Sequence, residues 1–274
     1  MDGITGIFER FMTPTTNGGD YVNDEGLLIC GVCGEEKQFY GDLFTGDRAK
    51  INCPCRCDKE REAAMKQRER QERITANRLS AFPINSSYIS ARFENASDTP
   101  TIKRSKKYSD NFTETFKPDG TGLLFYGTVG TGKTYAAACI CNAVVDMGYR
   151  AVFTSIPRII NKVQSGFDGR QEYIDFLCNV PLLVIDDLTA ERNSEFAKEI
   201  TFQVIDGRCS AKLPLVATTN LTLDEIKGKG ADTATARILS RLLEMCVPVE
   251  VTGDDQRRGK CRINYNRAKS ILEL

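Results

Sequence analysis

The sequence predicts an α/β fold in which a parallel β-sheet is sandwiched between helices. Short apolar runs bounded by turn residues recur from about residue 86 onward, and longer stretches with helical spacing separate them. Runs that are Leu-rich or β-branched throughout are typical of strands buried on both faces of a parallel sheet. A chain of 274 residues with 41% hydrophobic content is long enough for one such domain and a small appendage.

Each expected element can be located by its letters. The strands are expected at GLLFYG, RAVFTS, PLLVIDD, LPLVATT and VPVEV. The helices between them are expected at GKTYAAACICNAVVDMGY, SEFAKEITFQVIDGRCSA and TATARILSRLLEMC. Because strand and helix alternate along the chain, the strands are expected to run parallel in one sheet.

The chain ahead of this domain, which is expected to occupy residues 86–274, divides into three parts by composition. Residues 1–29 are Gly/Thr-rich and mildly acidic, and apolar residues at helical spacing predict a short amphipathic helix there. Residues 30–57 form a polar, Gly-rich segment with clustered cysteines. Residues 58–85 are dense in mixed charges and good helix formers but lack an apolar stripe, which predicts a solvated linker helix.

Composition also limits the compartment and the partners. Lysine plus arginine total 37, as do aspartate plus glutamate, so net charge gives no general attraction to nucleic acid or to a membrane. No apolar run approaches the roughly 20 residues that span a bilayer, and the first residues lack the basic and apolar regions of a secretory signal. We therefore expect a cytoplasmic protein that keeps its 11 cysteines reduced.

The string GTVGTGKT, residues 127–134, has the pattern of a phosphate-binding loop, and it follows an apolar strand and opens a helix. Glycines let backbone N–H groups surround a phosphate at the helix N-terminus, where the helix dipole favours negative charge. Lys133 would reach the β- and γ-phosphate oxygens, and the Thr134 hydroxyl would bind magnesium. The expected nucleotide-binding residues of this loop are Gly127, Thr128, Gly130, Thr131, Gly132, Lys133 and Thr134.

Two further strands end in polar side chains that are expected beside this loop. PLLVIDDL ends in Asp186 and Asp187, and Asp186 is expected to hold magnesium together with Thr134. Asp187 is expected to act on the attacking water as a general base or to orient it. LPLVATTN places Asn220 at the tip of the next strand, where its amide can position the same water. The three motifs in this order predict an enzyme that hydrolyses a nucleotide.

These motifs resemble those of the AAA+ ATPases, and among them the DnaC-like helicase loaders and the related IstB transposition proteins. The resemblance is carried, over about residues 86–260, by the strings GTVGTGKT, LLVIDDL, IDGRCSAKLPLVATTNLTLDEI, ARILSRLLEMC and GDDQR. It implies ATP as the nucleotide and Asn220 as the sensor 1 residue. It further implies that Arg241 is an arginine finger for the ATP of a neighbouring subunit, and that Arg257 contacts ATP as a sensor 2-like residue. Arg237 is the alternative finger, and a surface ion pair is the alternative role for each arginine.

Two features depart from many AAA+ relatives. The second acid of the Walker B motif is Asp187 rather than a glutamate, and this shorter side chain affects the expected rate of hydrolysis more than nucleotide binding. The chain ends at Leu274, soon after the last expected strand, so the fold is expected to lack the helical lid of many relatives. Helicase loaders share this shortness, which argues against a protein-remodelling unfoldase.

Five cysteines of the N-terminal part have the spacing of a zinc ribbon. Cys30 and Cys33 form a C-x-x-C pair, and nineteen residues separate it from CPCRC, which holds Cys53, Cys55 and Cys57. The chain has no histidine, so a closed tetrahedral site of four thiolates is expected to hold a structural Zn²⁺. Cys30, Cys33 and two of the other three would bind it, with Cys53 and Cys55 favoured. A redox pair or unrelated thiols are the alternative.

The resemblance also implies partners. Similar phage and Gram-positive-type loaders carry a zinc ribbon ahead of the ATPase, where the N-terminal part grips the replicative helicase. It therefore implies an ATP-dependent loader that delivers a hexameric replicative DNA helicase to single-stranded DNA in replication initiation, with ATP hydrolysis as a release switch. One alternative is an IstB-like ATPase that regulates transposition by assembling on duplex DNA. Another is a nucleotide-binding adaptor with negligible turnover.

DNA contacts are expected from basic and aromatic stretches. Basic side chains release phosphate counterions, and aromatic rings stack on single-stranded bases. RRGKCRINYNRAK near the C-terminus and KRSKK at 103–107 are the basic stretches. The family places DNA contacts in the segment that holds Phe167, Tyr173 and Phe176, for which core packing is the alternative role.

Overall fold

The computed structural model describes most of the chain in two compact units, Met1–Glu72 and Arg73–Leu274. The described residues are 16, 18–43, 46–82, 86–165, 169–188, 194–255, 265, 268–269 and 271–272. The predicted N-terminal helix, Phe167 and Arg257 lie outside this set. The division between the units falls within the predicted linker helix rather than at one of its ends.

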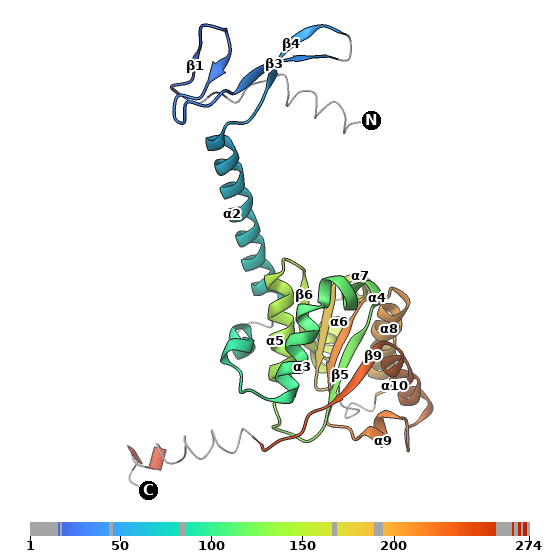
Figure 1. Ribbon diagram of the computed structural model, residues 1–274. Coiled ribbons are helices and arrows are strands. Elements are labelled where there is room, and N and C mark those ends of the chain that lie inside the picture. Colours follow the sequence, from blue (N-terminus) through green and yellow to red (C-terminus); the bar gives the residue numbers. More distant parts are fainter. Residues whose placement is uncertain are drawn as a thin grey trace. The chain divides into compact units, whose positions relative to one another are not determined.

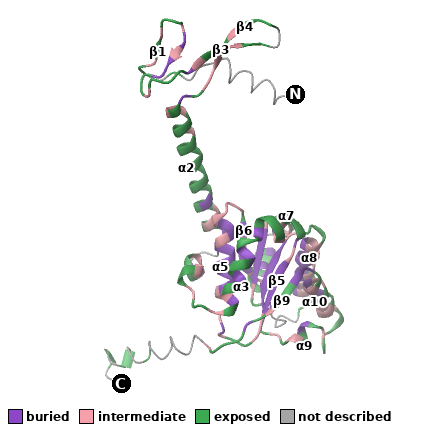
Figure 2. Cartoon of the chain, in the orientation of Figure 1, coloured by how far each residue is buried: buried purple, intermediate pink, exposed green. Residues whose placement is uncertain are grey.

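The N-terminal unit contains two small antiparallel sheets and the first part of a helix. Its strands pair as two hairpins, β1 with β2 and β3 with β4. The helix α2 is exposed along most of its length, which agrees with its mixed charges and missing apolar stripe (Figure 2). The elements are β1 (Tyr21–Val22), β2 (Leu28–Ile29), β3 (Gln38–Asp42), β4 (Arg48–Asn52) and α2 (Arg56–Ala81), which continues into the second unit.

The second unit is built on a five-stranded sheet in which every pair of neighbours is parallel. The strand order is β6-β7-β8-β5-β9. Figure 1 labels β6, β5 and β9 of this sheet. The strands are β5 (Gly122–Tyr126), β6 (Ala151–Ser155), β7 (Leu182–Asp186), β8 (Leu215–Thr218) and β9 (Cys246–Glu250). All five predicted strands and their parallel direction are therefore confirmed.

The central strands are apolar throughout because both faces of the sheet are covered. Successive side chains of a strand point to opposite faces. In β5, Leu123 and Phe125 pack into the core that includes α5, and Leu124 packs into the core that includes α8 and α10. Figure 2 shows the resulting concentration of buried residues in the sheet and α5. Two cores, one on each face, hold the sandwich together.

Helices supply the other side of each core. The predicted helices are confirmed as α5, α8 and α10. None of the described helices has the length and apolar character needed to cross a bilayer. The main helices are α3 (Pro100–Asp110), α5 (Lys133–Asp146), α6 (Ile156–Ser165), α7 (Arg170–Asn179), α8 (Glu195–Ser210) and α10 (Thr233–Met245). The short helices are η1 (Ser87–Ser90), η2 (Phe93–Asn95), η3 (Phe112–Phe116), α4 (Lys117–Asp119) and α9 (Leu223–Ile226).

The strand order brings the three predicted motifs to one edge of the sheet. β5 pairs with β8, and β8 pairs with β7, all in parallel. The carboxyl ends of these strands therefore adjoin. The glycine-rich loop follows β5, the acidic pair ends β7, and Asn220 follows β8. Ligands of open α/β sheets bind outside the carboxyl ends of the strands, so this edge is where a site is expected.

Candidate functional site

A cavity of about 590 Å³ opens at this edge of the second unit. Its volume is within the range of sites for small molecules and cofactors. The predicted residues that line it are Gly130, Thr131, Gly132, Lys133, Thr134, Asp186, Asp187 and Asn220. The predicted magnesium ligands, Thr134 and Asp186, are both among them, so the cavity can hold a nucleotide with its metal ion.

The glycine-rich loop has a backbone that only glycine adopts readily. Gly127, Gly130 and Gly132 have φ angles of 128°, 83° and 98°. A Cβ at Gly127 would lie 2.5 Å from the carbonyl oxygen of Val251, and a Cβ at Gly130 would collide with the Asp255 side chain. Gly132 caps the N-terminus of α5, a 14-residue helix whose first turn opens onto the cavity. This loop and helix therefore form the kind of anion site that phosphates occupy.

Lys133 holds a buried positive charge at the start of that helix. The residue is 6% exposed. Its Nζ donates hydrogen bonds to the carbonyl oxygens of Gly127 at 2.8 Å and Thr128 at 2.7 Å. Thr131 Oγ1 also donates to Thr128 O, at 2.9 Å. Gly127 and Thr128, which do not line the cavity, thus hold the lysine that does, and an ammonium group in this position attracts an anion.

The acidic pair is organised by one hydroxyl group. Thr218 Oγ1 donates to Asp186 Oδ1 at 2.7 Å and accepts from the Asp187 backbone N–H at 2.8 Å. Asp187 has a φ of 53°, in the left-handed region that aspartate tolerates better than most residues. Asn220 Nδ2 donates to Asp187 Oδ1 at 3.2 Å. The structure therefore brings together the two predicted carboxylates and the predicted amide, and adds Thr218, to which the sequence assigned no role.

A second wall of the cavity comes from segments ahead of α3. Tyr88, Asn95, Ser97 and Thr99 line it, as does Tyr135 from α5. Tyr88, Asn95, Ser97 and Thr99 belong to short helices and their connections, and the motifs that predicted the nucleotide site do not include them. Together the walls offer a phosphate-binding loop on one side and aromatic and polar side chains on the other, which fits a nucleotide.

The predicted finger arginines are engaged within their own chain. Arg241 on α10 pairs through Nε with Asp206 at 2.8 Å and through Nη1 with Glu244 at 2.7 Å. Arg237 lies over the ring of Phe202, 4.3 Å from its centroid. Neither lines the described cavity. Their action on the ATP of a neighbouring subunit stays a prediction, as does the role of Arg257.

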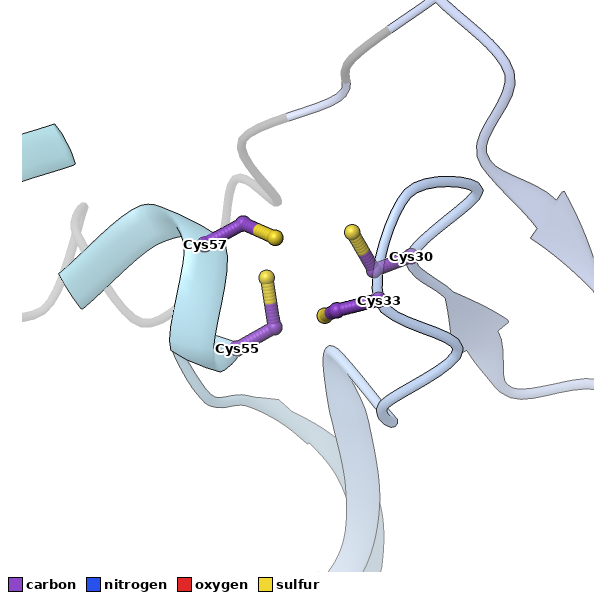
Figure 3. A group of neighbouring side chains, drawn as sticks. All are labelled: Cys30, Cys33, Cys55 and Cys57. Carbon is purple, nitrogen blue, oxygen red and sulfur yellow. The ribbon is translucent and has the colours of Figure 1, made fainter. Parts of the chain in front are cut away.

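Four cysteines of the N-terminal unit converge on one point (Figure 3). The sulfur atoms of Cys30, Cys33, Cys55 and Cys57 all lie within 4.8 Å of one another. A tetrahedral zinc site with Zn–S bonds of 2.3 Å has sulfur atoms about 3.8 Å apart. Cys30 and Cys33 follow β2, Cys55 lies just before α2 and Cys57 is in its first turn, so a zinc ion here would join the hairpin to the helix. The four thiols fit Zn²⁺.

The group contains Cys57 instead of Cys53, which differs from the sequence-based preference. The Cys53 sulfur donates to the carbonyl oxygen of Glu36 at 3.5 Å. The physical reason is a change of backbone conformation within CPCRC. The chain leaves β4 at Asn52 and enters α2 at Arg56, so its alternating cysteines do not share one face of a strand.

Burial and close spacing shift the pKa values of these thiols in different directions. A hydrogen bond from the Glu35 backbone lowers the pKa of Cys33 to about 7. The hydrogen bond with Cys33 raises the pKa of Cys57 to about 11, and burial raises the pKa of Cys55 to about 12. Thiolates this close repel one another and cannot all ionise alone. A bound metal ion removes that repulsion and takes all four as thiolates.

A buried lysine is connected to the cysteine group through Asp58. Lys37 is 2% exposed, and its Nζ lies 3.0 Å from Asp20 Oδ2 and 3.1 Å from Asp58 Oδ2. Cys55 Sγ donates to the same Asp58 oxygen at 3.3 Å. Burial alone would lower the pKa of Lys37, but its hydrogen bonds to both carboxylates raise it above the usual value. Lys37 thus ties the first loop to the start of α2, a role that no sequence pattern indicated.

Part of the predicted DNA-contacting set is accessible. Phe176 is 36% exposed, and the Arg150 guanidinium lies 5.3 Å from its ring centroid. Tyr173 is only half-buried but packs against the core. In KRSKK, Lys103 and Lys106 each pair with a neighbouring aspartate. Phe176 can therefore offer an exposed ring with the Arg150 cation above it. The charges of Lys103 and Lys106 are already partly neutralised.

The comparison with protein families gives a match over most of the chain. The family described as IstB-like ATP binding protein matches residues 58–263. The chain belongs to this family. The match begins in α2 and includes the glycine-rich loop, the acidic pair and Asn220, the residues around which the cavity is built.

This member of the IstB-like family is similar to two named helicase loaders. It is 24% identical over 246 residues to the replicative helicase loader DnaI of Bacillus subtilis (strain 168), covering 83% of this chain and 78% of that protein. It is 28% identical over 176 residues to the replicative helicase loader DnaC of Escherichia coli (strain K12), covering 61% and 69%. A crystal structure of DnaI has a TM-score of 0.56 at 19% identity, covering 66% of this chain and 98% of that one. The structural likeness confirms the AAA+ type of α/β fold.

Replacing Thr218 with valine is expected to slow ATP hydrolysis by this IstB-like protein while largely preserving ATP binding. The change removes the donor to Asp186 and the acceptor for the Asp187 N–H, and small displacements of catalytic groups cost about 10- to 100-fold in rate. Phosphate release and binding of a fluorescent ATP analogue would measure the two properties separately.

Thr201→Val is the matched control, because this buried hydroxyl donates only to Ala197 O of its own helix, at 2.7 Å. It should leave the rate of hydrolysis unchanged. Wild-type hydrolysis by Thr218→Val would show that the bridging hydroxyl does not organise the acidic pair.

Cys57→Ser is expected to lose bound zinc, whereas Cys53→Ser is expected to keep one zinc ion per chain. Cys57 belongs to the group of four converging thiols, whereas Cys53 does not. Removing one thiolate from a closed site leaves it with three ligands and exposes the metal. Elemental analysis of the purified proteins, with protein concentration from amino-acid analysis, gives the stoichiometry. Equal zinc content in the two variants would contradict the assigned ligand set.

Proposed function

We propose that this protein is an ATP-dependent loader that delivers a hexameric replicative DNA helicase to single-stranded DNA in the cytoplasm during replication initiation. The observation that carries the proposal is the cavity in which the glycine-rich loop, Asp186, Asp187 and Asn220 meet. The similarity to DnaI supports it further. That similarity covers 83% of the chain and so extends beyond the second unit into the N-terminal one.

The residues of the cavity have distinct proposed tasks. ATP supplies the phosphoryl group and Mg²⁺ stabilises the charge on its oxygens. Lys133 and the backbone N–H groups of its loop bind the phosphates, while Thr134 and Asp186 hold the metal ion. Asn220 engages Asp187 Oδ1 and so fixes this carboxylate, which leaves Oδ2 to take a proton from the attacking water.

Hydrolysis is proposed to depend on assembly of several copies. Arg241 would exchange its ion pairs with Asp206 and Glu244 for the γ-phosphate bound by a neighbouring subunit. Both pairs are partly solvent-exposed and therefore weak, so the exchange costs little. Such fingers increase phosphoryl-transfer rates by about 10³ to 10⁵. A single copy would then hydrolyse ATP very slowly, and hydrolysis can act as a release switch.

The zinc-bound cysteine group is proposed to fold the surface that binds the helicase. A segment with few large apolar residues needs a metal to gain a stable fold, because it cannot bury enough apolar area by itself. The ATPase unit would respond to ATP and to single-stranded DNA, with Phe176 and Arg150 as a candidate stacking pair.

The family description favours a second candidate function. The family is described as IstB-like ATP binding protein. A protein of this kind that regulates transposition would assemble with ATP on duplex DNA. The N-terminal cysteine group distinguishes the two proposals, because a helicase-binding adaptor needs such a segment and a filament on duplex DNA does not.

Native mass spectrometry of the zinc-loaded protein with the host replicative helicase is the test of the loader proposal. A complex is expected with the wild-type protein and with Cys53→Ser, which keeps the four converging thiols. Cys30→Ser/Cys33→Ser should lose the complex because its N-terminal unit unfolds without zinc. Assembly of the wild-type protein on duplex DNA with ATP, and no complex with the helicase, would overturn the proposal in favour of the transposition role.

A further inference from the structure

The C-terminal end of α2 is fixed to the ATPase unit at the far end of the P-loop helix α5. Phe82, just past the helix, stacks on Phe153 of β6 with ring centroids 5.2 Å apart. Asn77 Nδ2 donates to the carbonyl oxygens of Gly148 and Tyr149, each at 3.5 Å. These contacts place the last turns of α2 against the turn that follows α5.

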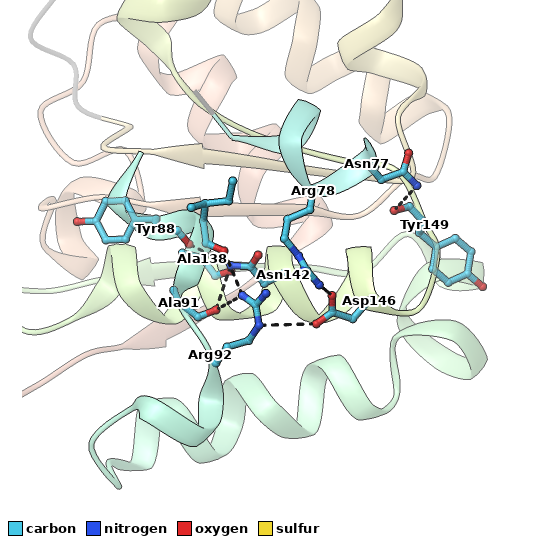
Figure 4. A network of polar contacts seen from close by, with 10 residues as sticks. Asn77, Arg78, Tyr88, Ala91, Arg92, Ala138, Asn142, Asp146 and Tyr149 are labelled. Carbon is cyan, nitrogen blue, oxygen red and sulfur yellow. Dashed lines mark hydrogen bonds and ion pairs between the residues drawn. The ribbon is translucent and has the colours of Figure 1, made fainter. Parts of the chain in front are cut away.

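Asp146, the last residue of α5, joins two segments that are separate in the sequence (Figure 4). Arg78 of α2 contacts its Oδ1 through Nη2, and Arg92 lies with Nε 3.8 Å from its Oδ2. A carboxylate at the C-terminus of a helix faces the negative end of the helix dipole, which disfavours its charge, and nearby cations offset this effect. The two arginines provide them, and each therefore matters for the position of the other.

Arg92 does not line the nucleotide cavity but contacts Tyr135, which does: the Tyr135 hydroxyl donates to the carbonyl oxygen of Arg92 at 3.2 Å. Arg92 Nη1 donates to Ala91 O at 2.8 Å. The fully buried Asn142 of α5 donates to Ala91 O and to Tyr88 O, both at 3.0 Å, and Tyr88 lines the cavity. The helix that begins with the phosphate-binding lysine thus holds Tyr88 of the opposite wall directly through Asn142, and it holds the neighbouring Arg92 through Asp146.

We propose that Arg78 and Asp146 are positioning residues for the nucleotide, acting through Arg92 and the cavity wall. A bound nucleotide fixes the wall and with it the Arg92–Asp146 pair, and a fixed Asp146 holds Arg78 more firmly. Docking of the α2 end and nucleotide binding therefore favour each other, by the same factor in both directions. The inference rests on the proposed nucleotide site.

The coupling has a consequence for regulation. α2 is one continuous helix that starts at Arg56, between the cysteines Cys55 and Cys57. The helix that begins at the metal group therefore ends at a contact that depends on the nucleotide. Nucleotide binding can therefore favour the docked state of the end of α2, a helix whose first residues belong to the segment with the cysteine group.

Titration of the full-length, zinc-loaded protein with a fluorescent ATP analogue tests the proposal. Arg78→Met removes the charge but keeps most of the side-chain length, and the Kd is expected to rise about fivefold or more. Arg78→Lys keeps the charge and should restore most of the affinity. Arg70→Met, at an exposed arginine of the same helix, should leave the Kd unchanged.

Two further measurements separate coupling from simple stabilisation. Saturating ATP should slow hydrogen exchange of the backbone amides of residues 74–81 in the wild type, and this protection should be lost in Arg78→Met. The Kd of the double variant Arg78→Met/Asp146→Asn for the ATP analogue should be no higher than that of the weaker-binding single variant. The reason is that both substitutions remove the same ion pair.

A purely structural contact would lower the melting temperature of Arg78→Met and leave its Kd for ATP at the wild-type value, and that result would overturn the proposal. A wild-type protein that binds no ATP would instead reject the nucleotide site itself. The two failures are therefore distinguishable.

Discussion

The hydroxyl group of Thr218 is the constraint on which the candidate ATPase centre depends. It joins the ends of two neighbouring strands by donating to Asp186 and accepting from the backbone of Asp187. Asp187 can keep its left-handed backbone because this bond and the bond from Leu188 N to Thr218 O fix both sides of it. The parallel pairing of β7 with β8 and of β8 with β5 then sets these groups opposite the glycine-rich loop.

The fold could be predicted from the sequence because its signals are local. Each strand is a short apolar run, and the predicted helices α5, α8 and α10 are longer stretches between such runs. The helices α3, α6 and α7 were not predicted. The glycine-rich loop could be placed for the same reason, since its glycines, lysine and threonine are contiguous and follow a strand. The position of each motif after a predicted strand was sufficient to predict that the loop, the acidic pair and Asn220 lie at one edge of a parallel sheet.

Features that depend on long-range contacts could not be predicted. The direction of the chain after β4 decides that Cys57, and not Cys53, joins the cysteine group. The spacing of the cysteines in the sequence does not specify that direction. Arg208 gives a second example: it is fully buried and donates to the carbonyl oxygens of Leu177, Val180 and Pro214. Its sequence neighbours do not distinguish it from a surface arginine.

We propose that ATP hydrolysis at the sheet edge releases a helicase held by the N-terminal unit. The most direct measurement is the lifetime of the complex with the helicase in ATP and in a non-hydrolysable ATP analogue, for the wild type and for Asp187→Asn. We expect a short lifetime only for the wild type in ATP, because only that combination completes hydrolysis. Equal lifetimes under all four conditions would contradict it.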